Sequence, residues 1–145
     1  MSARLLEGVK VLDVAGEPLA MAGRMLSDLG AEVVRLEPPG GDPLRNAPPF
    51  AGDSGLSLRF LAWNVGKTSI EFSASDKRID ALILGADVII ETPGFPGALE
   101  LPPSSAPQAT WLKATPFGLK GPRSRWRASD LGLLAASGNL YATGY

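Results

Sequence analysis

The chain has 145 residues, about the size of one domain, with 14 lysines and arginines against 15 aspartates and glutamates. Hydrophobic residues make up 45% of it, enough for a packed core, so we do not expect a disordered chain. The chain contains no histidine and no cysteine. This excludes a Ser-His-Asp or Cys-His catalytic site, an iron–sulfur cluster and a thiolate zinc site, and we predict no metal.

The formal charge of −1 indicates no broad basic surface. We therefore predict no nucleic-acid partner and no binding to an anionic membrane. No run of residues approaches the 18 apolar positions of a membrane-spanning helix, and no basic start precedes a long apolar run. These features predict a soluble, cytoplasmic protein.

The first part of the chain alternates strand and helix patterns. Residues 9–14 and 32–36 are short and rich in β-branched side chains, as is typical of buried strands. Between them, Pro18 suits the first turn of a helix and Gly30 suits its end. The helix would present one apolar stripe, formed by Leu19, Ala22, Leu26 and Leu29. A strand, a helix and a strand in this order predict a parallel sheet.

The remainder of the chain continues this alternation less regularly. Residues 37–57 are dense in Pro, Gly and Asp and predict a long surface loop, and residues 93–107 predict an irregular segment. Further strands are expected at 68–72, 87–91 and 110–115, and short helices at 58–63, 76–84 and 130–136. Asp76 or Ser75 would be the N-cap of the second of these helices. The sequence therefore predicts an α/β fold.

Two partial motifs bear on nucleotide binding. The dinucleotide motif Gly-x-Gly-x-x-Gly would fall at residues 15–20, where the sequence supplies one glycine, Gly16. Glu37, at the end of the second strand, resembles a ribose-binding acid, so a nicotinamide-dependent dehydrogenase stays as a distant alternative. Gly66-Lys67-Thr68 resembles the end of a P-loop, but position 61 is Leu61 and a strand follows instead of a helix. We reject the P-loop.

A basic cluster lies near the carboxyl end of the chain, where Arg123, Arg125 and Arg127 flank Trp126. One interpretation is a solvated loop with Trp126 packed on the core. The other is a site for a phosphorylated small molecule, bound through charge-assisted hydrogen bonds. Asp130, which follows, is better explained as a helix cap than as a catalytic carboxylate. The residues alone indicate an anion site at the carboxyl edge of the sheet.

Several segments, in one order along nearly the whole chain, match a known family. They are residues 6–13, 28–43, 86–91 and 96–100, with Asn64, Lys67, Ser69 and Ile70 between them. Near the end, Phe117-Gly118, Gly121-Pro122, Asp130, Ser137-Gly138 and Thr143-Gly144 fall at matching spacing. With these motifs the chain resembles the N-terminal part of the class III CoA-transferases, a family that includes formyl-CoA:oxalate CoA-transferase and the α-methylacyl-CoA racemases.

The resemblance implies a Rossmann-like, mostly parallel sheet with flanking helices, incomplete relative to the family's full chain. Residues 1–145 would be the N-terminal part of the large domain that binds coenzyme A. Family enzymes move CoA from an acyl-CoA to a carboxylic acid acceptor. An Asp carboxylate attacks the thioester to give a mixed anhydride and then an enzyme-bound thioester. This nucleophile lies downstream of the match to Thr143-Gly144, so we expect no catalytic residue in this chain.

The resemblance also implies CoA contacts at particular positions. Gly16 and Glu17 would contact CoA after the first strand, and Pro38 after the second. The adenine and pantetheine side would be lined by Phe72, Thr92, Pro93 and Phe95. Arg127 would meet a phosphate. Lys67 has a structural interpretation as well, as the partner of an acid at the base of a loop.

The chain departs from the family pattern in three places. The loop after the first strand is one residue short, Leu101 and Pro102 stand where a basic residue is usual, and the helices around 73–85 and 98–109 are abbreviated. CoA binding could therefore be weakened. The alternative is a degenerate, non-catalytic CoA-binding or partner subunit. In either case we expect a homodimer, or a hetero-oligomer with a chain that carries the catalytic Asp.

Overall fold

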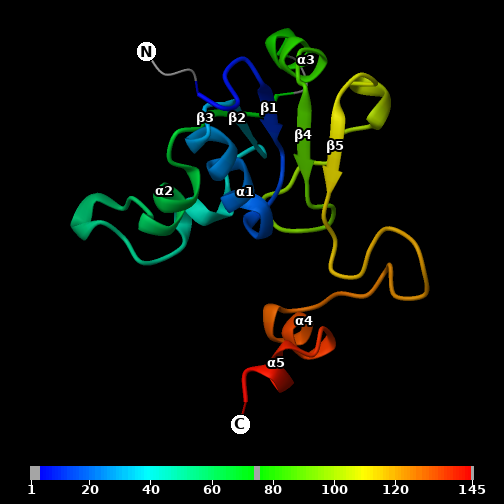
Figure 1. The fold of residues 1–145 in the computed structure, drawn as a ribbon. Helices are drawn as coiled ribbons and strands as arrows, with labels where there is room; N and C mark the ends of the chain where they lie inside the picture. The colour runs from blue at the N-terminus through cyan, green and yellow to red at the C-terminus, as the bar shows by residue number, and fades with distance from the viewer. Residues whose placement is uncertain (1–3, 74–75, 145) are drawn as a thin grey trace. The chain divides into compact units, whose positions relative to one another are not determined.

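The computed structural model describes residues 4–73 and 76–144. The chain divides into two compact units, Met1–Lys113 and Ala114–Tyr145. The first unit contains the sheet with helices α1 to α3, and the second contains helices α4 and α5 (Figure 1).

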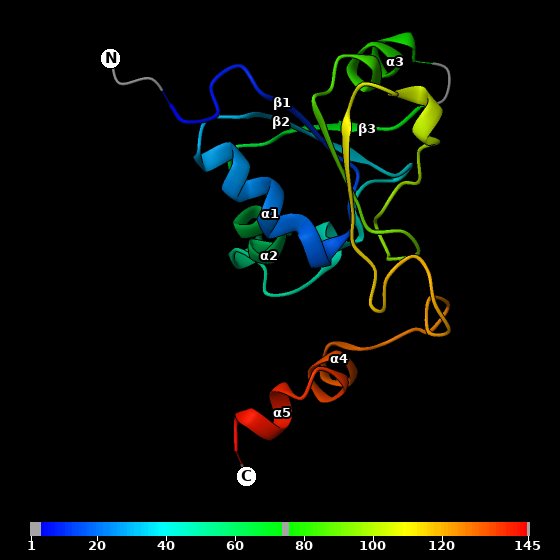
Figure 2. The same cartoon turned by 45° about the vertical axis from the view of Figure 1, so that its right-hand side comes forward.

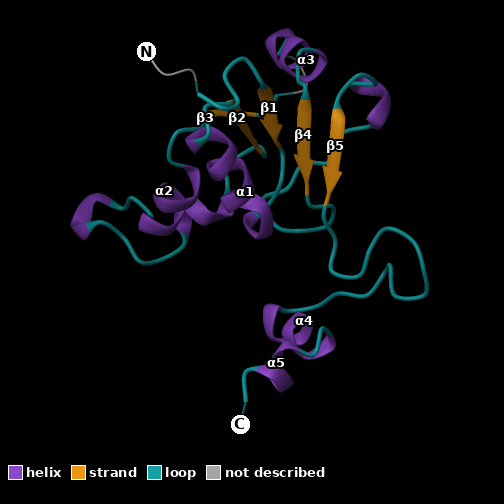
Figure 3. Ribbon diagram, viewed as in Figure 1, coloured by secondary structure: helices purple, strands orange, loops and turns teal. Residues whose placement is uncertain are grey.

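Within the described residues, five strands form one sheet in the order β3-β2-β1-β4-β5 (Figure 3). Every neighbouring pair is parallel, which confirms the predicted parallel sheet and α/β fold. The predicted strands are also confirmed to within two residues at each end. They are β1 Lys10–Asp13, β2 Glu32–Glu37, β3 Thr68–Glu71, β4 Val88–Glu91 and β5 Thr110–Lys113.

The predicted helices of the first unit are confirmed as α1 Glu17–Asp28, α2 Leu58–Asn64 and α3 Lys77–Leu84. Asp76 is the N-cap of α3, since its side chain accepts a hydrogen bond from the Arg78 N–H, whereas Ser75 lies outside the described residues. The prediction of a plain loop over 37–57 is incomplete. Residues 37–57 contain two short 3₁₀ helices, Pro43–Asn46 and Gly52–Ser54. The segment 93–107, predicted to be irregular, contains a third, Pro103–Ser105.

Alternating strand residues build a core on each face of the sheet. One face packs against α3, through Leu12, Val34, Ile89, Ile79 and Ile83. The other packs against α1, through Val11, Val33, Ile90, Leu19 and Leu26. Figure 2 accordingly shows α1 and α2 on one side of the strands and α3 on the other. No described helix has the length and apolar character needed to span a membrane.

The second unit consists of a long loop followed by α4 Asp130–Ala136 and α5 Asn139–Ala142. The prediction that Asp130 is the helix cap is wrong by one residue: Ser129 has extended dihedrals and its side chain accepts from the Gly132 N–H, while Asp130 is already helical. Trp126 is 57% exposed and packs edge-to-face on Phe117 within this unit. Helix α5 has no counterpart among the predicted elements.

Candidate functional site at the carboxyl edge of the sheet

The loops that follow the parallel strands all emerge at one edge of the sheet, where ligands bind in open α/β folds. All the predicted CoA contacts of the first unit lie on these loops or at the start of α1. Arg127 lies in the second unit, in the loop before α4. The structure divides the residues of the first unit into two groups.

The first group joins the loops after β1 and β4. The Gly16 N–H donates to Thr92 Oγ1 over 2.6 Å, and both residues are buried. A Cβ on Gly16 would lie 2.5 Å from the Pro96 carbonyl oxygen and 3.2 Å from the Phe95 Cβ. Three predicted contacts, Gly16, Thr92 and Phe95, therefore lie together, and only glycine fits at position 16.

The amino end of α1 offers few donors to an anion. The Gly16 N–H is bonded to Thr92, Pro18 has no N–H, and the Leu19 N–H donates to the Gly16 carbonyl over 3.3 Å. Glu17 adds a negative charge in the first turn, where it forms an ion pair with Arg59 of α2. This helix end is therefore poorly suited to hold a phosphate, although its sequence context is the usual one for such a site.

The second group joins the loops after β2 and β3. The Phe72 N–H donates to the Glu37 carbonyl over 2.8 Å, which brings Phe72 beside the residue that precedes Pro38. The Phe72 ring packs against the core cluster on the α3 face. Pro38 is half-buried, as is Pro93 after β4. Near this group a pocket of about 360 Å³ is lined by Glu37, Gly40, Gly41, Arg45, Ser69 and Glu71.

Glu37 is not available as a ribose-binding acid. Its carboxylate accepts from Arg45 Nε over 2.7 Å and from Arg45 Nη2 over 2.5 Å, and also from Ser69 Oγ and the Asp42 N–H. Burial alone would raise the pKa of Glu37, but these hydrogen bonds and the Arg45 charge lower it to about 2. The carboxylate is thus ionised and fully engaged, which removes the feature that favoured a nicotinamide nucleotide.

Beneath the edge lies a buried network of two cations and two carboxylates. Lys67 Nζ lies 2.8 Å from Asp13 Oδ2, and Arg35 Nη2 lies 2.6 Å from Asp42 Oδ2. Arg35 Nη1 is also 3.5 Å from Asp13 Oδ1, which links the two pairs. The structural interpretation of Lys67 is therefore confirmed. Burial lowers the pKa of its amine, and the Asp13 charge opposes that shift.

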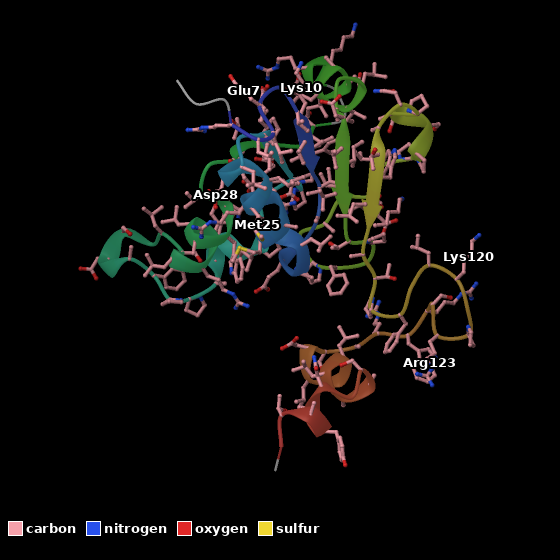
Figure 4. All side chains as sticks on the ribbon, viewed as in Figure 1. Glu7, Lys10, Met25, Asp28, Lys120 and Arg123 are labelled. Carbon is pink, nitrogen blue, oxygen red and sulfur yellow. The ribbon has the colours of Figure 1, made fainter. Side chains whose placement is uncertain are left out.

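The loop that leads to α4 carries free positive charge. From Leu101 to Ser129 the sequence contains five basic residues and no acidic one. The exposed cations of the second unit are Lys120, Arg123, Arg125 and Arg127, and none of them forms an ion pair in the described part of the chain. Figure 4 labels Lys120 and Arg123 on this loop. The Arg123 guanidinium lies 5.2 Å from the centre of the Trp126 ring. This loop suits anionic ligands better than α1 does.

Comparison with known proteins identifies the family. The family model described as CoA-transferase family III matches residues 6–145. The chain belongs to CoA-transferase family III.

Two curated relatives and one solved structure illustrate this membership. A probable CoA-transferase, Rv1866, of Mycobacterium tuberculosis is 36% identical over 86% of this chain and 17% of its own. The succinyl-CoA:(R)-benzylsuccinate CoA-transferase subunit BbsE of Thauera aromatica is 35% identical over 93% of this chain and 36% of its own. The crystal structure of a CAIB/BAIF family protein from Brucella suis superposes with a TM-score of 0.79 at 28% identity, covering 94% of this chain and 40% of that one.

This chain therefore spans between about one sixth and two fifths of the length of these CoA-transferase family III relatives. Its own edge residues include two that sequence reasoning missed, Arg35 and Asp42. The signal that could have found Arg35 is a charged residue between apolar neighbours, Val34 and Leu36, in the interior of a strand. A metal-binding group of three or more Asp, Glu, His or Cys side chains is absent from the residues described.

Proposed function

We propose that this chain is the N-terminal part of the CoA-binding domain of a class III CoA-transferase, over residues 1–145. The complete enzyme would move CoA from an acyl-CoA to a carboxylic acid. The nucleophilic Asp would come from sequence outside this chain. The family match over residues 6–145 supports the reaction class, and the convergence of Gly16, Thr92 and Phe95 at the carboxyl edge carries the assignment of the binding site.

The residues at the edge fit parts of CoA that differ in polarity. Gly16 lets the loops after β1 and β4 pack closely, and the half-buried Phe95 beside it provides apolar surface, as a narrow pantetheine arm requires. Phe72 and Pro38, near the pocket after β2 and β3, suit the adenine side. In the second unit Arg127 is exposed and has no carboxylate partner among the described residues, so its guanidinium is free for a phosphate.

We also propose that the chain works as a homodimer or with a partner chain that supplies the Asp. Apolar side chains are exposed along the outer faces of α1 and α2, at Met21, Met25, Leu29, Leu58, Leu61 and Val65. Their spacing of three and four residues forms a stripe on each helix, and exposed apolar stripes of this kind mark association surfaces. Light scattering at several protein concentrations would detect the association.

Isothermal titration of CoA into this chain, alone and with any natural partner, tests the proposal. The expected result is CoA binding by the isolated chain, with acyl transfer only when a partner that carries the nucleophilic Asp is present. No CoA binding in either arrangement would contradict it. CoA binding without transfer in the complete assembly would instead identify a non-catalytic subunit.

A further inference from the structure

Arg35 is a charged residue of the first unit whose side chain is buried. It belongs to β2, and its side chain is 2% exposed. Nη1 donates to the Ala15 carbonyl and, over 3.4 Å, to the Asp13 carbonyl. Nη2 donates to Asp42 Oδ2 over 2.6 Å and to the Gly97 carbonyl over 2.8 Å. One guanidinium thus holds groups from the loops after β1, β2 and β4.

These are the loops that carry most of the proposed CoA contacts. Ala15 immediately precedes Gly16, and Gly97 is two residues beyond Phe95. Asp42 belongs to the loop that begins at Pro38, and its other oxygen accepts from the Leu44 N–H over 2.9 Å.

The three loops also meet one another around the guanidinium. A Cβ on Gly97 would lie 3.1 Å from Asp42 Oδ1, and the Leu99 N–H donates to the Val14 carbonyl over 2.9 Å. The loops are therefore packed against each other at the point where Arg35 binds them.

The planar fork of an arginine suits this position better than any other side chain does. It presents five N–H donors in fixed directions, whereas a lysine presents three on one atom. Asp13 and Asp42 balance the charges of Arg35 and Lys67, so the network is neutral although it is buried. The adjacent strand residues Val34 and Leu36 belong to the core cluster that packs against α3, on the opposite face of the sheet.

We propose that Arg35 is a positioning residue for the CoA site, which rests on the proposed function. By bonding to three loops at once it fixes the spacing between Gly16, Pro38 and the segment from Thr92 to Phe95. Without Arg35 each loop would still follow its own strand, but its position relative to the other two loops would no longer be fixed. A site that is already ordered binds its ligand with less loss of entropy.

Hydrogen exchange and calorimetry on two variants test this role. Arg35→Lys keeps the charge but cannot span four acceptors, and Asp42→Asn weakens one link while the Leu44 cap can persist. Three amides report on the loops in the absence of any ligand: those of Gly16, Leu44 and Leu99. We expect the Gly16 and Leu99 amides to exchange faster in both variants and the Leu44 amide to exchange faster in Arg35→Lys, while the Gly85 amide at the end of α3 is unchanged. CoA affinity should fall by about tenfold or more.

Ile83→Val in α3 is the matched control, because it loosens the core on the opposite side of the sheet from α1. When Ile83→Val is compared with the other two variants under conditions of equal thermal stability, the exchange rates of the three loop amides and the CoA affinity should be unchanged. An equal loss of affinity in this control, or normal loop exchange in Asp42→Asn, would overturn the proposal. If Arg35→Lys does not fold, the measurements on Asp42→Asn test the proposal by themselves. Faster loop exchange in a protein that never binds CoA would support the positioning of the loops and refute the proposed function.

Discussion

Lys67 Nζ lies 2.8 Å from Asp13 Oδ2, and neither side chain is exposed. Helix α1 crosses this ion pair at Gly23, where a Cβ would come within 2.5 Å of the Asp13 carboxylate and 3.1 Å of the Lys67 chain. The helix approaches the buried pair closely because it has no side chain at this position.

We therefore expect Gly23→Ala to destabilise the protein, although alanine is the better helix former. The crowding should cost about 1–3 kcal/mol, measured by urea unfolding. Gly132→Ala in α4 is the control, since its Cβ would meet nothing closer than 3.4 Å. It should be neutral or stabilising by up to about 1 kcal/mol. Equal stabilisation by both substitutions would contradict the close approach.

The Glu37 carboxylate makes stability depend on pH. Its pKa is about 2 in the folded protein against an ordinary value of 4.5, so the folded state favours the ionised form. This stabilisation is complete above pH 4.5 and is lost as the pH falls toward 2. It amounts to something on the order of 3 kcal/mol.

Glu37→Gln should accordingly be less stable than the wild type at pH 7, and the difference should shrink as the pH falls to 3. Urea unfolding at several pH values measures it. Glu32→Gln, at an exposed position of the same strand, should have the same free energy of unfolding as the wild type at every pH. A stability difference that stays constant with pH would show that Glu37 is not linked to protonation in this way.

Gly16→Ala tests the contact between the loops after β1 and β4. Because the new methyl group would lie 2.5 Å from the Pro96 carbonyl, the two loops must separate. We expect CoA affinity to drop by about tenfold or more, since the proposed contacts Thr92 and Phe95 would move apart from residue 16. Calorimetry measures the affinity, and far-ultraviolet circular dichroism checks that the sheet is intact. Undiminished affinity in a folded variant would remove Gly16 from the site.

Arg127→Ala tests the phosphate contact in the second unit. The variant should lose about 1–3 kcal/mol of CoA binding energy, the usual contribution of a charge-assisted hydrogen bond. Arg123→Ala removes the same charge from the same loop, but the Arg123 guanidinium lies by the Trp126 ring. It should have the smaller effect. Equal losses for the two variants would point to a general charge effect instead of a specific contact.

The sequence could predict the parallel sheet because the strands are short apolar runs between clear turn residues. It could also predict that Gly16 and Thr92 share an edge, since parallel strands end on the same side. It could not identify Ser129 as the cap of α4, because Ser129 and Asp130 are both good capping residues and adjacent. The sequence could not predict the exposure of Trp126 either, because the residue type alone does not show whether an aromatic side chain is buried or exposed.

The burial of Arg35 depends on partners that no local pattern indicates. Its hydrogen bonds reach back 22 residues to Asp13 and forward 62 residues to Gly97. Glu37 shows the same difficulty: a strand-ending acid looks free until Arg45 and Ser69 are placed beside it. Networks of buried charge are set by tertiary structure and are therefore the part of the site that a sequence conceals.

Strand β1 precedes the other strands of this sheet in the chain but lies in its middle, with β2 on one side and β4 on the other. The Lys10 N–H is bonded to Asp87, 77 residues further on. A growing polypeptide on the ribosome must therefore wait until most of the first unit has emerged before its opening strand is enclosed. A truncation that begins beyond residue 9 would remove part of the central strand and leave β2 and β4 without the neighbour that joins them.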